Sequence, residues 1–252
     1  MIELQDIHKS FDGREVIKGI NAVFHTGQTN LIIGQSGSGK TVLLKCVVGL
    51  LNPDSGDILY DNRSLSAMDK NERVTLRTEM GMLFQGSALF DSMTIRDNVL
   101  FPLHMFSNLS DKEQVKRAMY CLERVGLGES ASLFPAEVSG GMQKRAAIAR
   151  AISLNPRYLF CDEPNSGLDP LTSIKIDELI TDITQEFGMT TVINTHDMNS
   201  VLTMGEKICF IYQGDKAWEG NREELYESDN ERLNEFVFAS KMMQKKTRKQ
   251  VQ

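Results

Sequence analysis

The stretch that decides the fold is Gly34-Gln35-Ser36-Gly37-Ser38-Gly39-Lys40-Thr41, which fits the phosphate-loop pattern G-x-x-x-x-G-K-[ST]. Three apolar residues, Leu31-Ile32-Ile33, precede it and predict a buried parallel strand. The mostly apolar residues 42–48 that follow can continue as a helix. Strand, glycine loop and helix in this order are the context the pattern requires. The sequence therefore predicts a nucleoside triphosphate site in an α/β, mostly parallel P-loop core.

The residue types in this loop match the chemistry of a phosphate. Glycines let the backbone turn so that several N–H groups converge on one anion, and a helix that begins near Gly39 adds the positive end of its dipole. Lys40 supplies a point charge for the β- and γ-phosphates. Thr41 supplies a hydroxyl for Mg²⁺, which keeps most of its other ligands as water and phosphate.

Composition limits the class of protein. The chain has 252 residues, of which 41% are hydrophobic and 25% charged, as in an ordinary globular protein. Its net charge of −6 gives no reason to expect nucleic acid as a partner. No apolar run approaches ~18 residues, and the acidic start of the chain is not typical of a signal peptide. The cysteines contain no C-x-x-C pair, so neither disulfides nor a zinc site are expected (Cys46, Cys121, Cys161, Cys209).

The first 30 residues predict a small antiparallel β subdomain. Residues 2–11 and 16–24 alternate apolar and polar side chains, and Asp12-Gly13 between them favours a turn. Phe11 lies at a strand end, where its position alone indicates simple core packing. A further short strand is expected over residues 57–60, and a surface helix over 71–78.

In residues 86–155, strand patterns give way to helical patterns, which predict an inserted α-helical subdomain. The segment Lys112 to Val125 carries apolar residues at helical spacing, with Ser110 and Glu113 as a capping box. Farther along, Ser139-Gly140-Gly141 opens another predicted helix and offers a second set of free N–H groups for an anion. A plain capped helix with a tight turn is the alternative, although two adjacent glycines cost stability.

Three predicted strands end in polar side chains that suit catalysis. Gln85 follows residues 81–84, the acids Asp162 and Glu163 follow 158–161, and His196 follows 190–195. Ligands of parallel sheets bind beyond the carboxyl ends of the strands. Asp162 is therefore expected to hold the Mg²⁺ shell, and Glu163 to act as general base for water. Gln85 could reach Mg²⁺ or the attacking water and His196 the γ-phosphate; an ordinary loop glutamine and a structural histidine are the alternatives.

The C-terminal third continues the α/β pattern. A long helix is expected from Leu171 to Phe187, a hairpin over residues 207–219 and a helix from Arg222 to Phe238. We assign residues 1–240 to one ATPase domain and 241–252 to a basic tail. Such a tail is usually a solvated end; contact with anionic lipid or with a partner protein is the alternative.

Together, these motifs resemble the nucleotide-binding subunit of an ATP-binding cassette (ABC) transporter over about residues 1–225. The motifs follow that family's order: an aromatic adenine stacker, Walker A, Q-loop, signature, Walker B, catalytic glutamate, D-loop and switch histidine (Phe11, Gly34–Thr41, Gln85, Ser139–Gly141, Tyr158–Asp162, Glu163, Ser166–Asp169, His196). Two of these motifs depart from the family pattern without removing the phosphate-contacting groups. Phe11 stands where Tyr is common, and Val138 and Met142 replace the signature's usual Leu and Gln.

The resemblance implies an ATPase that works as a head-to-tail dimer, with Mg²⁺ and ATP held between Walker A of one chain and the signature of the other. It implies a permease partner at the cytoplasmic face of the inner membrane, and accessory regulatory or lipid-binding periplasmic subunits. It implies four catalytic residues, three metal-site residues and a wider nucleotide-contacting set (catalytic Glu163, His196, Lys40, Gln85; metal Thr41, Gln85, Asp162; nucleotide Phe11, Val16, Gly34, Gln35, Ser36, Gly37, Ser38, Gly39, Lys40, Thr41, Ser139, Gly140, Gly141, Asp169).

A narrower resemblance concerns cargo. The segment Met82 to Phe90, the segment Asp97-Asn98-Val99 with Pro102-Leu103, and Ser139 to Met142 look like the ATPase of the Mla and mammalian-cell-entry-type phospholipid transporters. The resemblance implies ATP-driven phospholipid transport between the inner and outer membranes. An importer ATPase for amino acids or metals is the first alternative. A soluble ABC mechanoenzyme on nucleic acid or ribosomes is a distant one, as is a scaffold that binds ATP without hydrolysing it.

Overall fold

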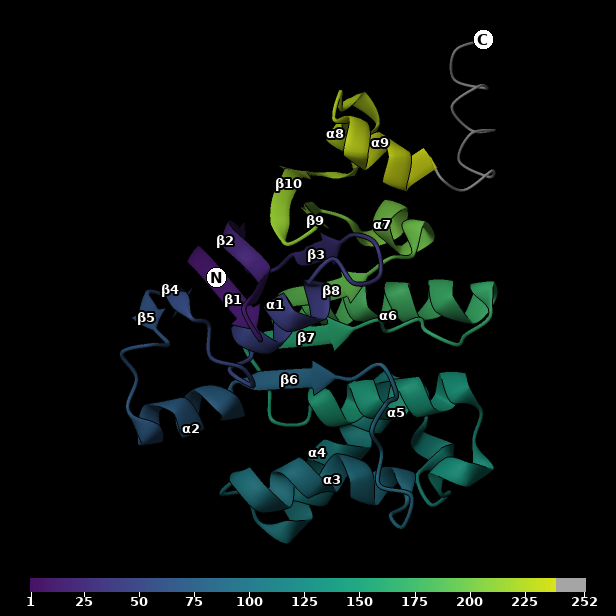
Figure 1. Cartoon of the computed structure of the whole chain (residues 1–252). Helices are drawn as coiled ribbons and strands as arrows, with labels where there is room; N and C mark the ends of the chain where they lie inside the picture. The colour runs from purple at the N-terminus through teal and green to yellow at the C-terminus, as the bar shows by residue number, and fades with distance from the viewer. Residues whose placement is uncertain (239–252) are drawn as a thin grey trace.

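The computed structural model of the chain describes residues 1–238; the basic tail expected at 241–252 lies outside this range. Within it, the strands form two sheets (Figure 1). The larger sheet has six strands in the order β10-β9-β3-β8-β7-β6, and all its pairings are parallel except that of β9 with β10 (β3 Thr29–Ile33, β6 Met80–Leu83, β7 Tyr158–Asp162, β8 Thr190–Thr195, β9 Lys207–Tyr212, β10 Asp215–Gly220). This confirms the α/β class.

The smaller sheet is antiparallel and has four strands in the order β2-β1-β4-β5 (β1 Ile2–Phe11, β2 Arg14–Phe24, β4 Ser55–Tyr60, β5 Arg63–Ser64). The alternating patterns of β1 and β2 predict this sheet. Its extent is larger than expected, because β4 lies against the other edge of β1 over Ile2–Gln5. Alternation shows that a strand has one buried face but does not show which strand lies beside it.

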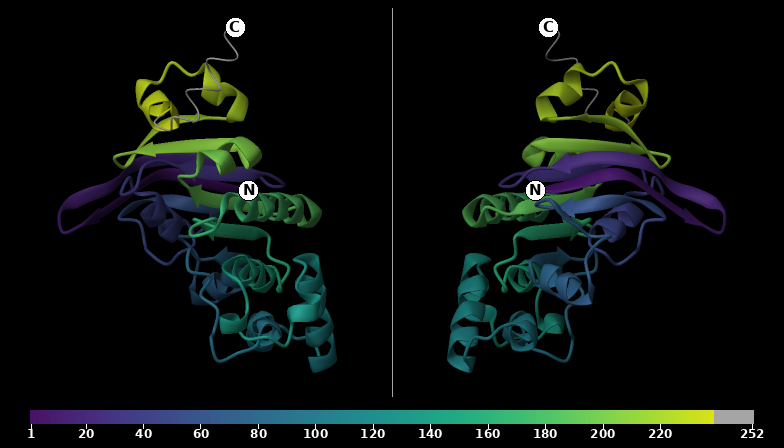
Figure 2. Two further views of the ribbon diagram at one scale, coloured as in Figure 1. Left: turned by 90° about the vertical axis from the view of Figure 1, so that its right-hand side faces the viewer. Right: turned by 90° about the vertical axis from the view of Figure 1, so that its left-hand side faces the viewer.

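The helices cover the larger sheet in two layers, each with its own apolar cluster. Helix α1 (Lys40–Val47) lies between the sheets and packs with Ile32, Phe160 and Val192. On the other face, α6 (Pro170–Phe187) and α5 (Gly140–Ala151) join a second cluster with α3 (Ile95–Phe106) and α4 (Asp111–Arg124). Figure 2 shows α3, α4 and α5 gathered below the sheet, at the far end from the C-terminal helices.

Local chemistry sets the helix boundaries. The expected capping box of Ser110 and Glu113 begins α4, and α2 (Lys70–Thr78) begins with a comparable box at Asp69. The single helix expected over 222–238 is wrong: the structure has α8 (Arg222–Glu227) and α9 (Glu231–Phe238). Asn230 separates them, since its Oδ1 accepts the Leu233 amide and its Nδ2 donates to Ala217. Helix α7 (Met198–Met204) follows β8, and two short 3₁₀ turns, Gly128–Ser130 and Pro135–Glu137, precede α5.

Candidate nucleotide-binding and catalytic site

The phosphate loop connects β3 to α1. Gly39, just before the helix, has φ 107°, which an L side chain rarely adopts. The buried Lys40 ammonium donates to the carbonyl oxygens of Gly34 (2.8 Å) and Gln35 (3.1 Å). Burial lowers the pKa of Lys40, and the nearby Glu163 and Asp162 act in the opposite direction. Ser38 Oγ is buried without a partner among the described residues. A loop with an unpaired hydroxyl and a buried cation fits a phosphate.

Two of the three predicted metal-site residues meet at the carboxyl end of β7. Thr41 Oγ1 lies 3.4 Å from Asp162 Oδ1, although 121 residues separate them in the chain. A hydroxyl and a carboxylate beside a phosphate loop are the oxygen ligands and outer-sphere partners that Mg²⁺ uses. The side chains present therefore fit a magnesium ion held jointly with a nucleotide.

Glu163 and His196 form a hydrogen-bonded pair. His196 Nδ1 lies 2.9 Å from Glu163 Oε1, and the pair joins the ends of neighbouring strands β7 and β8. Glu163 has φ 49°, an uncommon conformation for a residue with a side chain, and its amide donates to the Asn194 carbonyl at 3.0 Å. Such uncommon backbone geometry often marks functional sites. The predicted base and the predicted γ-phosphate contact are thus brought together.

Gln85 lies in the same pocket. Its Nε2 donates to Ser166 Oγ at 3.1 Å, and its carbonyl accepts a hydrogen bond from Lys144 on α5. The pocket is lined by the phosphate loop and by all four predicted catalytic residues (Val16, Ser36, Gly37, Gly39, Lys40, Thr41, Val42, Gln85, Glu163, His196).

A second pocket adjoins the phosphate loop and contains Phe11, the predicted adenine stacker. Phe11 at the end of β1 is 42% exposed, so core packing does not account for it. It lines this pocket with Val16, residues 35–38 of the phosphate loop, and Tyr212, Gln213 and Gly214 of the β9–β10 hairpin. No feature of the residues around Phe11 indicates that the β9–β10 hairpin, far along the chain, also lines this pocket.

The signature residues lie in another pocket of the chain. Ser139 caps α5, with its Oγ accepting from the Met142 amide at 3.3 Å, and Asp169 caps α6. These residues share a pocket with Gly140, Gly141 and Lys175, and none of its lining residues belongs to the phosphate loop. A Cβ on Gly141 would lie 2.6 Å from Thr172, so close helix packing requires this glycine. Within one chain, the two predicted phosphate-binding turns do not meet.

Sequence reasoning missed two groups of residues that contact the predicted site residues or the segment after Gln85. Asn194, on β8, donates its Nδ2 to Asp162 Oδ1 at 3.2 Å. Lys144 and Arg150 of α5 donate to the carbonyls of Gln85, Ser87 and Ala88. Asn194 sits two residues before His196, which could have drawn attention to it; Arg150 gives no comparable local signal.

Comparison with known proteins establishes the family. Residues 17–166 match the family model described as ABC transporter. The chain belongs to the ABC transporter family.

Several relatives are more than 30% identical. A probable ribonucleotide transport ATP-binding protein, mkl, of Mycobacterium leprae is 37% identical over 94% of this chain and 68% of that protein. The intermembrane phospholipid transport system ATP-binding protein MlaF of Escherichia coli K12 is 35% identical over 94% of this chain and 88% of that protein. The methionine import ATP-binding protein MetN of Clostridioides difficile is 34% identical over 94% and 74%.

Solved structures agree with these sequence matches. The dimeric ABC transporter cassette MJ0796 superposes with a TM-score of 0.80 at 33% identity, over 88% of this chain and 99% of that one. Another dimeric structure of it, bound to ADP and Pi, gives a TM-score of 0.79. The chain is an ATP-binding, ATP-hydrolysing subunit of an ABC transporter. In residues 1–238, no helix is long and apolar enough to cross a membrane.

Proposed function

We propose that this ATPase powers phospholipid transport between the inner and outer membranes, as a peripheral subunit on the cytoplasmic face of the inner membrane. One observation carries the cargo assignment: five residues of the Mla-like segments line an apolar pocket outside the nucleotide pockets (Met82, Phe84, Ala88, Phe90, Pro102). Other Mla-like residues, Gln85 and Ser139 to Met142, line the pocket around Lys40 and the signature pocket. An apolar surface of this kind contacts a partner, and partner identity determines cargo. The similarity to MlaF over 88% of that protein supports the same assignment.

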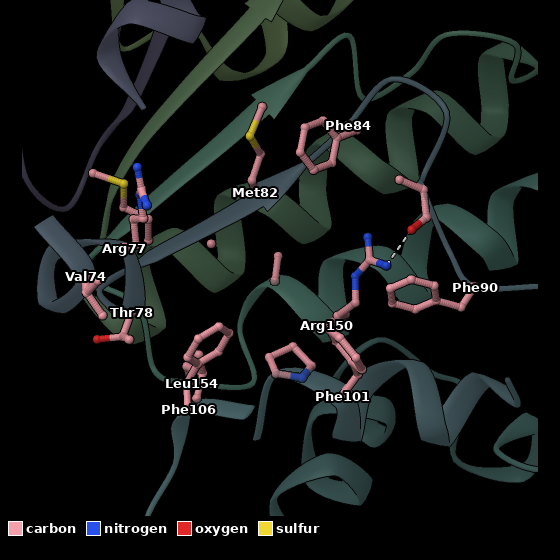
Figure 3. A pocket seen from close by; sticks show the side chains of 15 residues that line it. Val74, Arg77, Thr78, Met82, Phe84, Phe90, Phe101, Phe106, Arg150 and Leu154 are labelled. Carbon is pink, nitrogen blue, oxygen red and sulfur yellow. Dashed lines mark hydrogen bonds between the residues drawn. The ribbon is translucent and has the colours of Figure 1, made fainter. Parts of the chain in front are cut away.

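We call the apolar pocket the groove. It has a volume of about 480 Å³ and lies between α2, β6, α3 and α5 (Figure 3). Four phenylalanines line it, and its charged groups among the described residues are Arg77 and Arg150, with no carboxylate (Phe84, Phe90, Phe101, Phe106). A permease helix with an apolar face and an acidic side chain would complement it.

The catalytic roles follow from the pocket around Lys40. We assign Glu163 as the general base that accepts a proton from the attacking water, with His196 holding the carboxylate through its Nδ1 contact. Gln85 and His196 line the same pocket as Lys40 and would contact the γ-phosphate there. Thr41, Asp162 and Gln85 would hold Mg²⁺, which would supply positive charge to neutralise developing charge on the phosphates.

The same reasoning assigns a head-to-tail dimer. Ser139, Gly140 and Gly141 line a pocket distinct from that of the phosphate loop, so each needs a second chain to complete an ATP site. Both solved structures of the relative MJ0796 are described as dimeric. ATP then bridges two chains only in the closed state, and binding favours closure.

The test is a capture experiment with paired variants. The Glu163→Gln variant is expressed in the protein's own host, and membranes are solubilised in mild detergent with ATP. Proteins and lipids that co-purify with the variant are then identified. Phe106→Glu and Met105→Glu are compared in this background. These neighbours on α3 are 56% and 59% exposed, but only Phe106 lines the groove.

We expect a multi-pass permease with a lipid-binding periplasmic subunit and bound phospholipid, retained by Met105→Glu and lost from Phe106→Glu. A permease with a solute-binding protein would reject the phospholipid cargo and favour an amino-acid or metal importer, an alternative that the MetN relative supports. Ribosomes or nucleic acid without a permease would favour the soluble mechanoenzyme. Equal loss from both variants would reject the groove as the permease contact.

A further inference from the structure

Asn194 is a buried amide on the face of the central sheet that also carries the apolar residues Ile32, Phe160 and Val192. In register, it lies beside Ile32 of β3 and Asp162 of β7. Two residues earlier on the same strand, and therefore on the same face, Val192 packs with Phe160 in the cluster beneath α1. Asn194 itself is 0% exposed. An apolar side chain such as that of Val192 would serve packing equally well here.

A second buried asparagine on this face shows what a purely structural amide looks like. Asn30 accepts from the His25 amide and donates to three backbone carbonyls, those of His25, Gln28 and Thr191. Asn194 instead makes one side-chain hydrogen bond, from Nδ2 to Asp162, and its buried Oδ1 has no partner in the described chain. A buried polar atom left unpaired costs about 1–3 kcal/mol. Fold stability therefore gives no reason for an amide at this position.

The contacts of Asn194 point instead to the two acidic residues at the end of β7. Its side chain donates to Asp162 Oδ1 at 3.2 Å, and its carbonyl accepts from the Glu163 amide at 3.0 Å. The Thr41 hydroxyl reaches the same oxygen, Oδ1, at 3.4 Å. Two donors on one oxygen fix the rotation of the carboxylate and leave Oδ2 as the oxygen that faces neither of them.

We propose that Asn194 is a positioning residue that holds Asp162 in the orientation required to bind the Mg²⁺ shell. The proposal rests on the magnesium site proposed above. Asn194 acts through Asp162, to which it is hydrogen-bonded, and does not line the pocket around Lys40. Hydrogen-bond partners of this kind typically change metal affinity by about 10- to 100-fold when removed.

The experiment separates metal binding from nucleotide binding. Asn194→Val removes the amide and replaces it with an apolar side chain like that of Val192 on the same strand and face. In the Glu163→Gln background, which prevents turnover, a fluorescent ATP analogue is titrated in EDTA and then across Mg²⁺ concentrations. Mn²⁺ in place of Mg²⁺ gives a direct spectroscopic measure of bound metal. Val192→Ala, on the same strand and face, reports the effect of weakening β8 alone.

We expect Asn194→Val to raise the Mg²⁺ concentration needed for half-maximal effect by about 10-fold, with analogue affinity in EDTA unchanged. Val192→Ala should leave the Mg²⁺ requirement unchanged although its melting temperature falls. An unchanged requirement in Asn194→Val, or an equal rise in Val192→Ala, would overturn the proposal. If Asn194→Val does not fold, Asn194→Ala gives the same comparison.

Asp162→Asn distinguishes a failure of the proposed magnesium site from a failure of the proposed positioning role of Asn194. This variant should raise the Mg²⁺ requirement at least as much as Asn194→Val. If it has no effect, the magnesium site itself is misassigned. If Asp162→Asn has its effect and Asn194→Val has none, the metal site stands and the positioning role of Asn194 falls.

Discussion

The nucleotide side of the molecule and the groove are built in different ways, although they meet at residues 85–90. Around Lys40, polar atoms from strand ends and glycine turns converge, and Glu163, His196, Asp162 and Thr41 are held by hydrogen bonds. The groove is apolar and formed by side chains of α2, β6, α3 and α5. The first surface is specified by chemistry at fixed positions, and the second by shape. Changes on the nucleotide side should therefore alter rates, and changes in the groove should alter partnership.

The largest effect that tests this contrast is loss of hydrolysis with binding intact. Glu163→Gln keeps the shape of the side chain but removes the base, so we expect the rate to fall by about 10²–10⁴-fold with ATP still bound. Single-turnover ATPase and equilibrium binding measurements on the purified chain check both. Lys40→Ala is the control, because removal of the phosphate-binding cation should abolish binding. Near-normal turnover by Glu163→Gln would reject its assignment as the base.

The segment where the two surfaces meet provides a sharper test. Ser87 and Ala88 both have left-handed backbones, with φ of 61° and 49°. The partly buried Arg150 guanidinium donates to both of their carbonyls, at 2.8 and 2.6 Å, the second visible in Figure 3. Two consecutive residues of this kind are costly and need support from their surroundings. Arg150 thus holds the chain between Gln85 on the nucleotide side and Phe90 in the groove.

Arg150→Met keeps much of the aliphatic stem and removes the donors. We expect kcat to fall about 10-fold with KM for ATP nearly unchanged, because hydrogen bonds from charged groups contribute about 1.5–3 kcal/mol each. The control is Arg117→Met: Arg117 also donates to two backbone carbonyls, those of Ile152 and Ser153, but lines neither the groove nor the catalytic pocket. Equal loss of kcat in both variants would mean that Arg150 serves stability alone.

The contrast also explains what could be predicted from sequence. Some site residues form contiguous segments, such as residues 34–41 and Asp162-Glu163, whose residue types identify their chemistry. The P-loop core and the α/β class could therefore be predicted directly from the sequence. The groove has no such segment, because its lining comes from residues 74 to 154 and is brought together only by folding. Phe11 shows the same limit: its position alone favoured core packing, whereas the fold leaves it exposed in a pocket with Tyr212.

The smallest expected effect is a pH dependence of stability that arises near the nucleotide side, at Asp177, and not in the groove. This carboxyl on α6 is 1% exposed and accepts from Asn165 Nδ2 at 2.6 Å; the same Nδ2 reaches Ser200 Oγ at 2.9 Å. Asn165 follows Glu163 by two residues, and Ser200 follows His196 by four, so this cluster is close along the chain to the proposed catalytic pair. Burial raises the pKa of Asp177 to about 6, while the hydrogen bonds from Asn165 and Ser200 lower it.

Because the pKa of Asp177 is raised in the folded chain, the contribution of this carboxyl to the free energy of unfolding falls as pH rises. Below about pH 4 it is protonated whether folded or unfolded; above that, the unfolded chain releases the proton more easily, until the cost levels off above about pH 6. Asp177→Asn removes this dependence. Relative to the native chain, its free energy of unfolding should increase by about 1 kcal/mol between about pH 5 and about pH 7.5. Urea unfolding at both pH values measures the difference in free energy between variant and native chain. Phe106→Ala, in the groove, is the control, because it changes no ionisable group and its effect on stability should not depend on pH. A difference for Asp177→Asn that does not change with pH would show that the buried carboxyl does not titrate in this range.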